Sequence, residues 1–202
     1  MAKNYAEIAF TDGVKKEQEK YDSRRQYERM ERVARGTELS PDEAEFISAR
    51  DSFYLATTGE NGYPYVQFRG GAAGFLKVLD EQTLGFADFR GNRQYVSVGN
   101  LKNSRKAALI LMNYPTRQRL KIYAEIEIVD AEQDPELIAK LEMPGYEAKI
   151  ERAMILHVEA FDWNCPQHIT PRYTIDEIKQ IIAPLNQRIF ELEKEIERLK
   201  IK

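Results

Sequence analysis

The chain of 202 residues contains little cysteine and little histidine. Cys165 is its only cysteine, and His157 and His168 are its only histidines. A single cysteine cannot form an intrachain disulfide, and it excludes a zinc site built on paired cysteines. Neither histidine lies at the usual metal-ligand spacing from a second ligand, so the sequence does not favour a metal site. Cys165 is better explained as a small buried group than as a redox thiol.

The sequence also lacks a long apolar run and an excess of positive charge. No run approaches the roughly 20 apolar residues that a membrane span requires. The net charge of −3 argues against a nucleic-acid-binding protein, which normally presents a strongly basic face. Residues 1–31 have no apolar centre of the kind found in secretory signals. We therefore expect a cytoplasmic protein.

Charge and hydrophobic pattern divide the chain into three parts. Residues 1–50 form a charged, helical extension whose second helix is predicted after Ser40, where SPDEAEF offers an N-cap, a proline and acidic residues in the first turn. Residues 51–174 form a β-rich domain. Residues 175–202 form an amphipathic helix with a possible break at Pro184. This helix is either a dimer contact or a terminal helix packed on its own domain.

The middle part predicts six or seven strands joined mainly by tight turns. Apolar and β-branched runs are separated by short groups of turn residues, which is typical of hairpins. The expected strands are residues 53–59, 63–71, 74–79, 83–89, 107–115, 119–130 and 153–161, with turns at 60–62, 80–82 and 115–118. Closely spaced strands of this kind predict an α+β, mainly β fold: an antiparallel barrel with flanking helices.

A polar turn inside residues 84–111 has the composition of an anion site. It holds Asp88, Arg90, Asn92, Arg93 and Gln94 between two apolar runs. Asp, Gly and Asn favour tight turns, and the Arg93 guanidinium offers a fork of donors suited to phosphate. The alternative is a solvated turn followed by a short surface helix, and composition alone does not choose between the two.

The sequence resembles a known family at these same segments. The order YPYVQFRGG, LGFADFRGNRQYVSVGNL and RKAALIL is similar to the pyridoxamine 5′-phosphate oxidase family of FMN-binding split barrels, over residues 45–170. The run FDWNCPQHITPRY resembles a C-terminal signature of one branch of that family. The resemblance implies a split barrel, a homodimer with FMN at its interface, and oxidoreductase chemistry on a small molecule.

The resemblance also implies which residues would bind FMN. Asn92 stands where a serine is usual and Gln94 where a lysine is usual, so phosphate binding should be weaker unless Arg69, Arg90 or Lys102 compensates. Phe68 and Phe89 have core packing as an alternative role. The implied cofactor-binding residues are Gln67, Phe68, Arg69 and Gly70 for the ring and ribityl chain; Ala87, Asp88, Phe89, Asn92, Arg93 and Gln94 for the flavin and its phosphate; and Trp163 and Gln167 near the C-terminus.

Other functions remain open at this point. The run NCPQHITP does not match the oxidase pattern, so pyridoxamine 5′-phosphate is not the expected substrate. A flavin-binding carrier or sensor without turnover would share the same site. A deazaflavin shares the phosphate and ring requirements, and a heme with His168 as axial ligand is a further alternative. For His168 a hydrogen-bonded structural role stands beside these.

Overall fold

The computed structural model describes residues 4–31, 38–163 and 166–200. It divides into two compact units, one made of residues 1–113 with 118–165 and the other of residues 114–117 with 166–202. Cys165 lies outside the described residues, so its expected role as a small buried group stays a prediction.

In the described part of the chain, seven antiparallel strands form a single sheet in the order β2–β1–β5–β6–β7–β4–β3. The three expected hairpins are confirmed, because β1 pairs with β2, β3 with β4, and β5 with β6. Each hairpin joins strands that are neighbours in the chain, which is why local turn residues were enough to predict them. The strands are β1 (Ser52–Thr58), β2 (Pro64–Gly70), β3 (Lys77–Asp80), β4 (Thr83–Phe89), β5 (Lys106–Asn113), β6 (Gln118–Asp130) and β7 (Ile150–Trp163).

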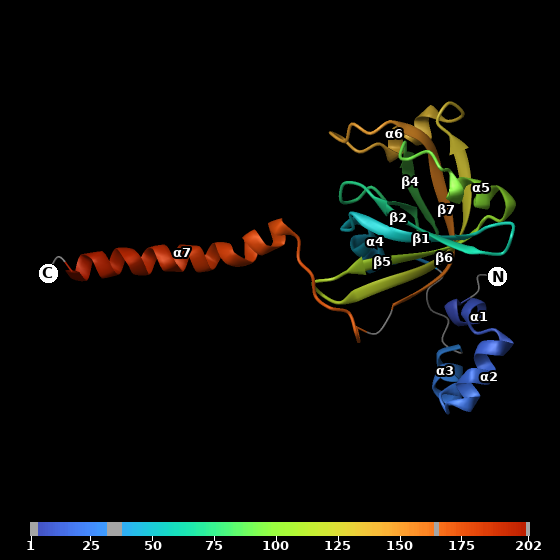
Figure 1. Cartoon of the computed structure of the whole chain (residues 1–202), viewed down its shortest axis with the longest axis horizontal. Coiled ribbons are helices and arrows are strands. Elements are labelled where there is room, and N and C mark those ends of the chain that lie inside the picture. Colours follow the sequence, from blue (N-terminus) through green and yellow to red (C-terminus); the bar gives the residue numbers. More distant parts are fainter. Residues whose placement is uncertain (1–3, 32–37, 164–165, 201–202) are drawn as a thin grey trace. The chain divides into compact units, whose positions relative to one another are not determined.

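The sheet curls strongly instead of lying flat. In the hydrogen-bonded order β2 is one edge, and four strands separate it from β4. Even so, Arg69 of β2 forms an ion pair with Asp88 of β4, and Phe53 of β1 packs edge-on against Phe86 of β4 with ring centroids 5.3 Å apart. Figure 1 shows β4 and β7 running across the direction of β1 and β5. The α+β, mainly β class is confirmed, and the hydrogen-bond ladder of the described strands is not closed between β2 and β3.

Short helices flank the sheet. The expected helix after Ser40 is confirmed as α4, which starts with a capping box between Ser40 and Glu43. Helix α6 was not predicted; it buries Ile138 and Leu141 against the sheet. Each of these helices has between five and nine residues. Their bounds are α1 (Tyr5–Ala9), α2 (Asp12–Lys20), α3 (Arg24–Glu31), α4 (Pro41–Ser48), α5 (Val96–Asn103) and α6 (Pro135–Leu141).

The second unit contains one long helix, α7 (Ile175–Lys200), of 26 residues. Thr174 and Glu177 form a reciprocal cap at its start, since the Thr174 hydroxyl accepts from the Glu177 N–H at 3.2 Å and the Glu177 carboxylate accepts from the Thr174 N–H at 2.7 Å. The possible break at Pro184 is absent from the structure, where α7 continues through that residue. Among the described residues, no helix combines the length and the apolar character needed to cross a bilayer.

Candidate functional site

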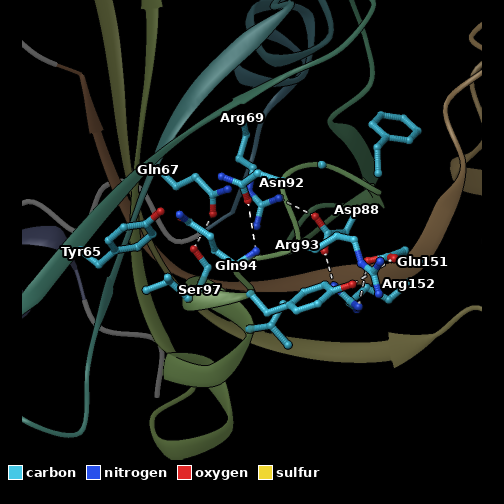
Figure 2. Close-up of a pocket in the computed structure, with 15 residues that line it drawn as sticks. Tyr65, Gln67, Arg69, Asp88, Asn92, Arg93, Gln94, Ser97, Glu151 and Arg152 are labelled. Atoms are coloured by element: carbon cyan, nitrogen blue, oxygen red, sulfur yellow. Dashed lines mark hydrogen bonds and ion pairs between the residues drawn. The ribbon is translucent and has the colours of Figure 1, made fainter.

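A pocket of about 240 Å³ lies beside the curled sheet, where β2, β4, β7 and α5 meet (Figure 2). It gathers arginine and amide side chains from segments far apart in the sequence. Its lining residues are Tyr65, Gln67, Arg69, Asp88, Phe89, Gly91, Asn92, Arg93, Gln94, Tyr95, Val96, Ser97, Val98, Glu151 and Arg152.

Strand β2 contributes every second residue to the pocket. Tyr65, Gln67 and Arg69 line it, whereas Val66 and Phe68 are exposed, as the alternation of side chains along a strand requires. Helix α5 is fixed next to β2 because the Ser97 hydroxyl donates to the Gln67 side-chain oxygen at 2.7 Å.

A buried carboxylate holds two of the arginines. Asp88 is 4% exposed; its Oδ1 accepts from Arg69, and its Oδ2 accepts from Arg152 at 2.7 Å. Arg152 comes close because the β4–β7 register places it directly opposite Asp88. Both guanidinium groups are thereby fixed at the pocket wall, where the dashed lines of Figure 2 mark these ion pairs.

The Nε of Arg69 is a donor without an acceptor. It is buried, and no hydrogen-bond partner is present for it among the described residues. A buried donor without an acceptor costs about 1–3 kcal/mol. An acceptor on a bound molecule would remove this cost, and Arg69 lines the pocket.

The loop before α5 is held in an uncommon backbone conformation. Arg93 and Tyr95 have φ of +61° and +54°, in the left-handed region that residues other than glycine rarely adopt. The Asn92 side-chain oxygen accepts from the Gln94 N–H at 3.2 Å, which supports the turn. Such conformations cost on the order of 1–3 kcal/mol each and are concentrated at functional sites.

The N-terminus of α5 adds donors to the same pocket. Its N-cap residue, Tyr95, makes no side-chain capping bond, and the first helical residues, Val96, Ser97 and Val98, line the pocket. The first N–H groups of a helix have no intrahelical acceptor and carry partial positive charge. This end of α5 is therefore suited to an anion.

Charged side chains leave the pocket with net positive charge. Three lining residues are arginines, namely Arg69, Arg93 and Arg152, and two are acids, Asp88 and Glu151. A hydrogen bond with the Tyr95 side chain raises the pKa of the Arg93 guanidinium. The pKa of Glu151 is lowered, chiefly because the Arg90 side chain donates to its carboxylate, at 2.8 Å. Both shifts favour the charged forms of Arg93 and Glu151.

The structure brings together seven of the residues implied by the family resemblance. Of the possible compensating cations, Arg69 lines the pocket, Arg90 pairs with Glu151, and Lys102 is not among the lining residues. Arg152 is the additional cation. The seven are Gln67, Arg69, Asp88, Phe89, Asn92, Arg93 and Gln94.

The other five lie outside the pocket lining. Phe68 is on the opposite face of β2, where its ring packs edge-on against the Tyr54 ring with centroids 5.7 Å apart. Gly70 lies against the Phe68 ring, and a Cβ added to Gly70 would be 2.9 Å from it. Ala87 is buried in the core. The Trp163 indole N–H donates to the Glu43 carboxylate of α4 at 2.6 Å. Gln167 is an exposed residue of the second unit.

Sequence reasoning missed five polar or aromatic lining residues. Tyr65 was detectable, because it precedes Gln67 and Arg69 by steps of two along a strand. Glu151 and Arg152 had no such signal, since only the pairing of β4 with β7 brings them to the pocket. Tyr95 and Ser97 lie in the segment LGFADFRGNRQYVSVGNL that resembles the family, but they were not predicted to line the site.

Histidine does not contribute to this pocket. His168 is exposed and has φ of +62°, and the His157 ring lies 3.5 Å from the Glu127 carboxylate on the outside of the sheet. Among the described residues, no group of three or more histidine, cysteine or acidic side chains is arranged to hold a metal ion.

Three solved structures illustrate which proteins the chain is similar to. A protein from Lactobacillus delbrueckii, described as a candidate pyridoxamine 5′-phosphate oxidase, is 22% identical, with 62% of this chain and 94% of that chain covered and a TM-score of 0.47. An FMN-binding protein from Syntrophomonas wolfei is 16% identical, with 61% and 85% covered and a TM-score of 0.46. The heme storage protein HutZ from Vibrio cholerae is 17% identical, with 62% and 94% covered and a TM-score of 0.37.

A comparison with curated proteins found no match. The family model for pyridoxamine 5′-phosphate oxidase matches residues 39–160. This range contains all seven strands apart from the last residues of β7, and it contains every residue that lines the pocket. Because the match covers more than half of the sequence, the chain belongs to the pyridoxamine 5′-phosphate oxidase family.

Proposed function

We propose that the protein binds FMN in this pocket and acts as an oxidoreductase on a small molecule. The observation that carries the proposal is the convergence of Arg69, Arg93 and Arg152 with the uncapped N-terminus of α5 in one pocket. A phosphate group needs charge-assisted donors of this kind. When bound, FMN supplies the electron or hydride transfer, while the protein positions it.

The donor set fits the two ends of FMN. Arg93 and the first N–H groups of α5 are suited to the phosphate. Gln67 and the unpartnered Nε of Arg69 are suited to the polar edge of the ring or the ribityl chain. Asp88 does not need to touch the cofactor, because its two oxygens hold Arg69 and Arg152. Fixing donors in advance lowers the cost of binding.

We further propose that a second copy of the chain completes the pocket. At about 240 Å³ the pocket is smaller than the roughly 300–1,000 Å³ that is usual for cofactor-sized ligands. The outer face of β1, β2 and β5 exposes Tyr54, Val66, Phe68 and Ile110, which are neighbours through the pairs Tyr54–Phe68 and Tyr54–Ile110. Apolar patches of this kind mark protein interfaces.

A flavin carrier or sensor without turnover is the second candidate. The observation that favours it is that both acids lining the pocket are engaged by arginines, which leaves no obvious general acid or base there. Comparing the rate at which small acceptors reoxidise the reduced protein with the rate for free flavin separates the two candidates. Faster reoxidation of the protein supports the oxidoreductase.

The first experiment is an absorption spectrum of the purified protein, followed by mass identification of any released cofactor. We expect a two-banded flavin spectrum and the mass of FMN. The mass separates FMN from a deazaflavin. A single intense Soret band would indicate heme instead, although the described lining residues include no histidine, cysteine or methionine. A colourless protein that does not bind added FMN would contradict the proposal.

Arg93→Ala should weaken FMN binding. Losing a hydrogen bond to a charged group costs about 1.5–3 kcal/mol, which corresponds to an increase in Kd of roughly 10- to 150-fold. Quenching of flavin fluorescence during titration measures this Kd. Arg105→Ala is the matched control, because Arg105 is half exposed and pairs with Glu127 away from the pocket. Equal FMN affinity in the two variants would refute the assigned phosphate site.

A further inference from the structure

Eight apolar residues of α7 follow a heptad repeat, and Ile181, Ala183 and Phe190 lie outside it. The eight are separated by alternating steps of three and four residues over nearly four heptads, so they lie on one stripe of the helix. Every one is exposed, between 40% and 73%. The residues of this seam are Ile175, Ile178, Ile182, Leu185, Ile189, Leu192, Ile196 and Leu199.

The residue types in the seam are specific to one kind of coiled coil. Written as a heptad abcdefg with Ile175 at a, every a position is isoleucine and three of the four d positions are leucine: Leu185, Leu192 and Leu199. Isoleucine at a with leucine at d favours a parallel, two-stranded coiled coil, because the two positions pack in different geometries in a parallel dimer.

The charges beside the seam agree with a parallel partner of identical sequence. In such a pair each g residue faces the e residue five positions later in the other helix. Arg188 at g then faces Glu193 of the second copy, and Glu195 at g faces Lys200 of the second copy. Both pairs have opposite charge. An antiparallel pair with full overlap would instead place the two copies of Arg188 next to each other.

Pro184 is compatible with this arrangement. It occupies a c position, which faces away from a partner helix, so its ring does not interrupt the seam. Proline inside a helix costs about 3 kcal/mol, and helices gain most of their stability by burying an apolar stripe. The sequence keeps the repeat unbroken on both sides of Pro184, as expected where a partner helix offsets this cost.

We propose that α7 forms a parallel, in-register, two-stranded coiled coil with α7 of a second copy of this chain. The seam from Ile175 to Leu199 is about 36 Å long at 1.5 Å per residue. The assignment uses only α7 and does not depend on cofactor binding, so it stands or falls separately from the proposed FMN site.

Disulfide trapping in the full chain tests the proposal. In a Cys165→Ser background, Leu199→Cys places one thiol at a d position, where a parallel pair brings the two copies together. We expect mild oxidation to convert the chain to a disulfide-linked dimer on a non-reducing gel. Lys194→Cys, at the outward f position, is the matched control and should remain monomeric on the same gel.

Two other results would overturn the proposal. In an antiparallel pair the Leu199→Cys variant stays monomeric on the gel, and an Ile175→Cys, Leu199→Cys double variant becomes linked between chains. If α7 instead packs on its own chain or on another protein, neither variant gives a linked dimer.

Charge reversal provides a second test with the same readout. Arg188→Glu, added to the Leu199→Cys chain, places an acid opposite Glu193 of the second copy, while the Glu195–Lys200 pairs are unchanged, and it should lower the yield of linked dimer. Adding Glu193→Arg restores opposite charges and should restore the yield. An unchanged yield in the single reversal would contradict the parallel register.

Discussion

Asp88 fixes the positions of two pocket arginines, Arg69 and Arg152. Family resemblance placed it among the cofactor-binding residues, and in the structure its two carboxylate oxygens are taken up by Arg69 and Arg152. The sequence identified Asp88 and Arg69, because both fall in recognisable segments. It did not identify Arg152, because that residue becomes a neighbour only through the register of β4 with β7.

Asp88→Asn should destabilise the protein. The change removes the charge that compensates two mostly buried arginines, whose side chains are 13% and 12% exposed. Breaking a buried ion pair costs about 3–5 kcal/mol, which for a chain of this size lowers the Tm by on the order of 10 °C. Thermal unfolding followed by circular dichroism measures the change. Asp176→Asn, at an exposed ion pair of α7, is the control, and an equal Tm for the two variants would contradict this role.

Elements were predictable where the deciding interactions are local. The hairpins and α4 follow from turn and cap residues that lie within a few positions of each other. Helix α6 escaped prediction because its seven residues bury only Ile138 and Leu141, too short a pattern to show helical periodicity. The position of the β3–β4 hairpin at the far end of the sheet also depends on the pairing of β4 with β7, which is far along the chain and was not predicted.

Helix α4 depends on Glu43 for both its cap and its attachment to β7. The Glu43 carboxylate accepts from the Ser40 N–H at 3.0 Å and from the Trp163 indole at 2.6 Å. Burial raises the pKa of Glu43, but these hydrogen bonds outweigh burial, and the net pKa is lowered. The ionised form is therefore stabilised by folding.

Glu43→Gln should lower the free energy of unfolding at neutral pH by about 1–2 kcal/mol, the usual effect of losing an N-terminal cap interaction. A carboxyl group whose pKa is lowered by folding stabilises the protein above its unfolded pKa of about 4.3. That contribution is lost as the pH falls through the lower pKa of the folded state. The difference between wild type and variant should thus shrink below about pH 4. Urea unfolding across pH measures it. Glu45→Gln, on the exposed side of α4, is the control; a difference that persists in acid would contradict the assignment.

At the scale of the whole molecule, two separate surfaces are proposed to join the same two chains: the outer face of the sheet around Val66 and Phe68, and the seam of α7. Each proposed contact is symmetric, so each is compatible with a two-fold dimer. Linked contacts of this kind reinforce each other through high effective concentration.

Breaking one surface should therefore leave a dimer, and breaking both should give a monomer. Phe68→Glu puts a charge on the sheet face, where Phe68 is 60% exposed, and because the second copy is proposed to complete the pocket, it should also weaken FMN binding. Leu192→Glu puts a charge in the seam. Light scattering after size-exclusion chromatography should find a dimer for each single variant and a monomer for the double variant. A monomeric single variant would show that the remaining surface does not hold the chains together.

The order of the strands has a consequence for the timing of biosynthesis. The pocket draws on residues from Tyr65 to Arg152, and β4 has its hydrogen-bonded neighbours in β3 and the final strand β7. While the chain emerges from the ribosome, Asp88 lacks its second arginine until Arg152 has been made and β7 has paired with β4. Chains that stop before residue 150 would thus lack Glu151 and Arg152 of the pocket lining, and the proposed FMN binding would report that synthesis has passed the start of β7.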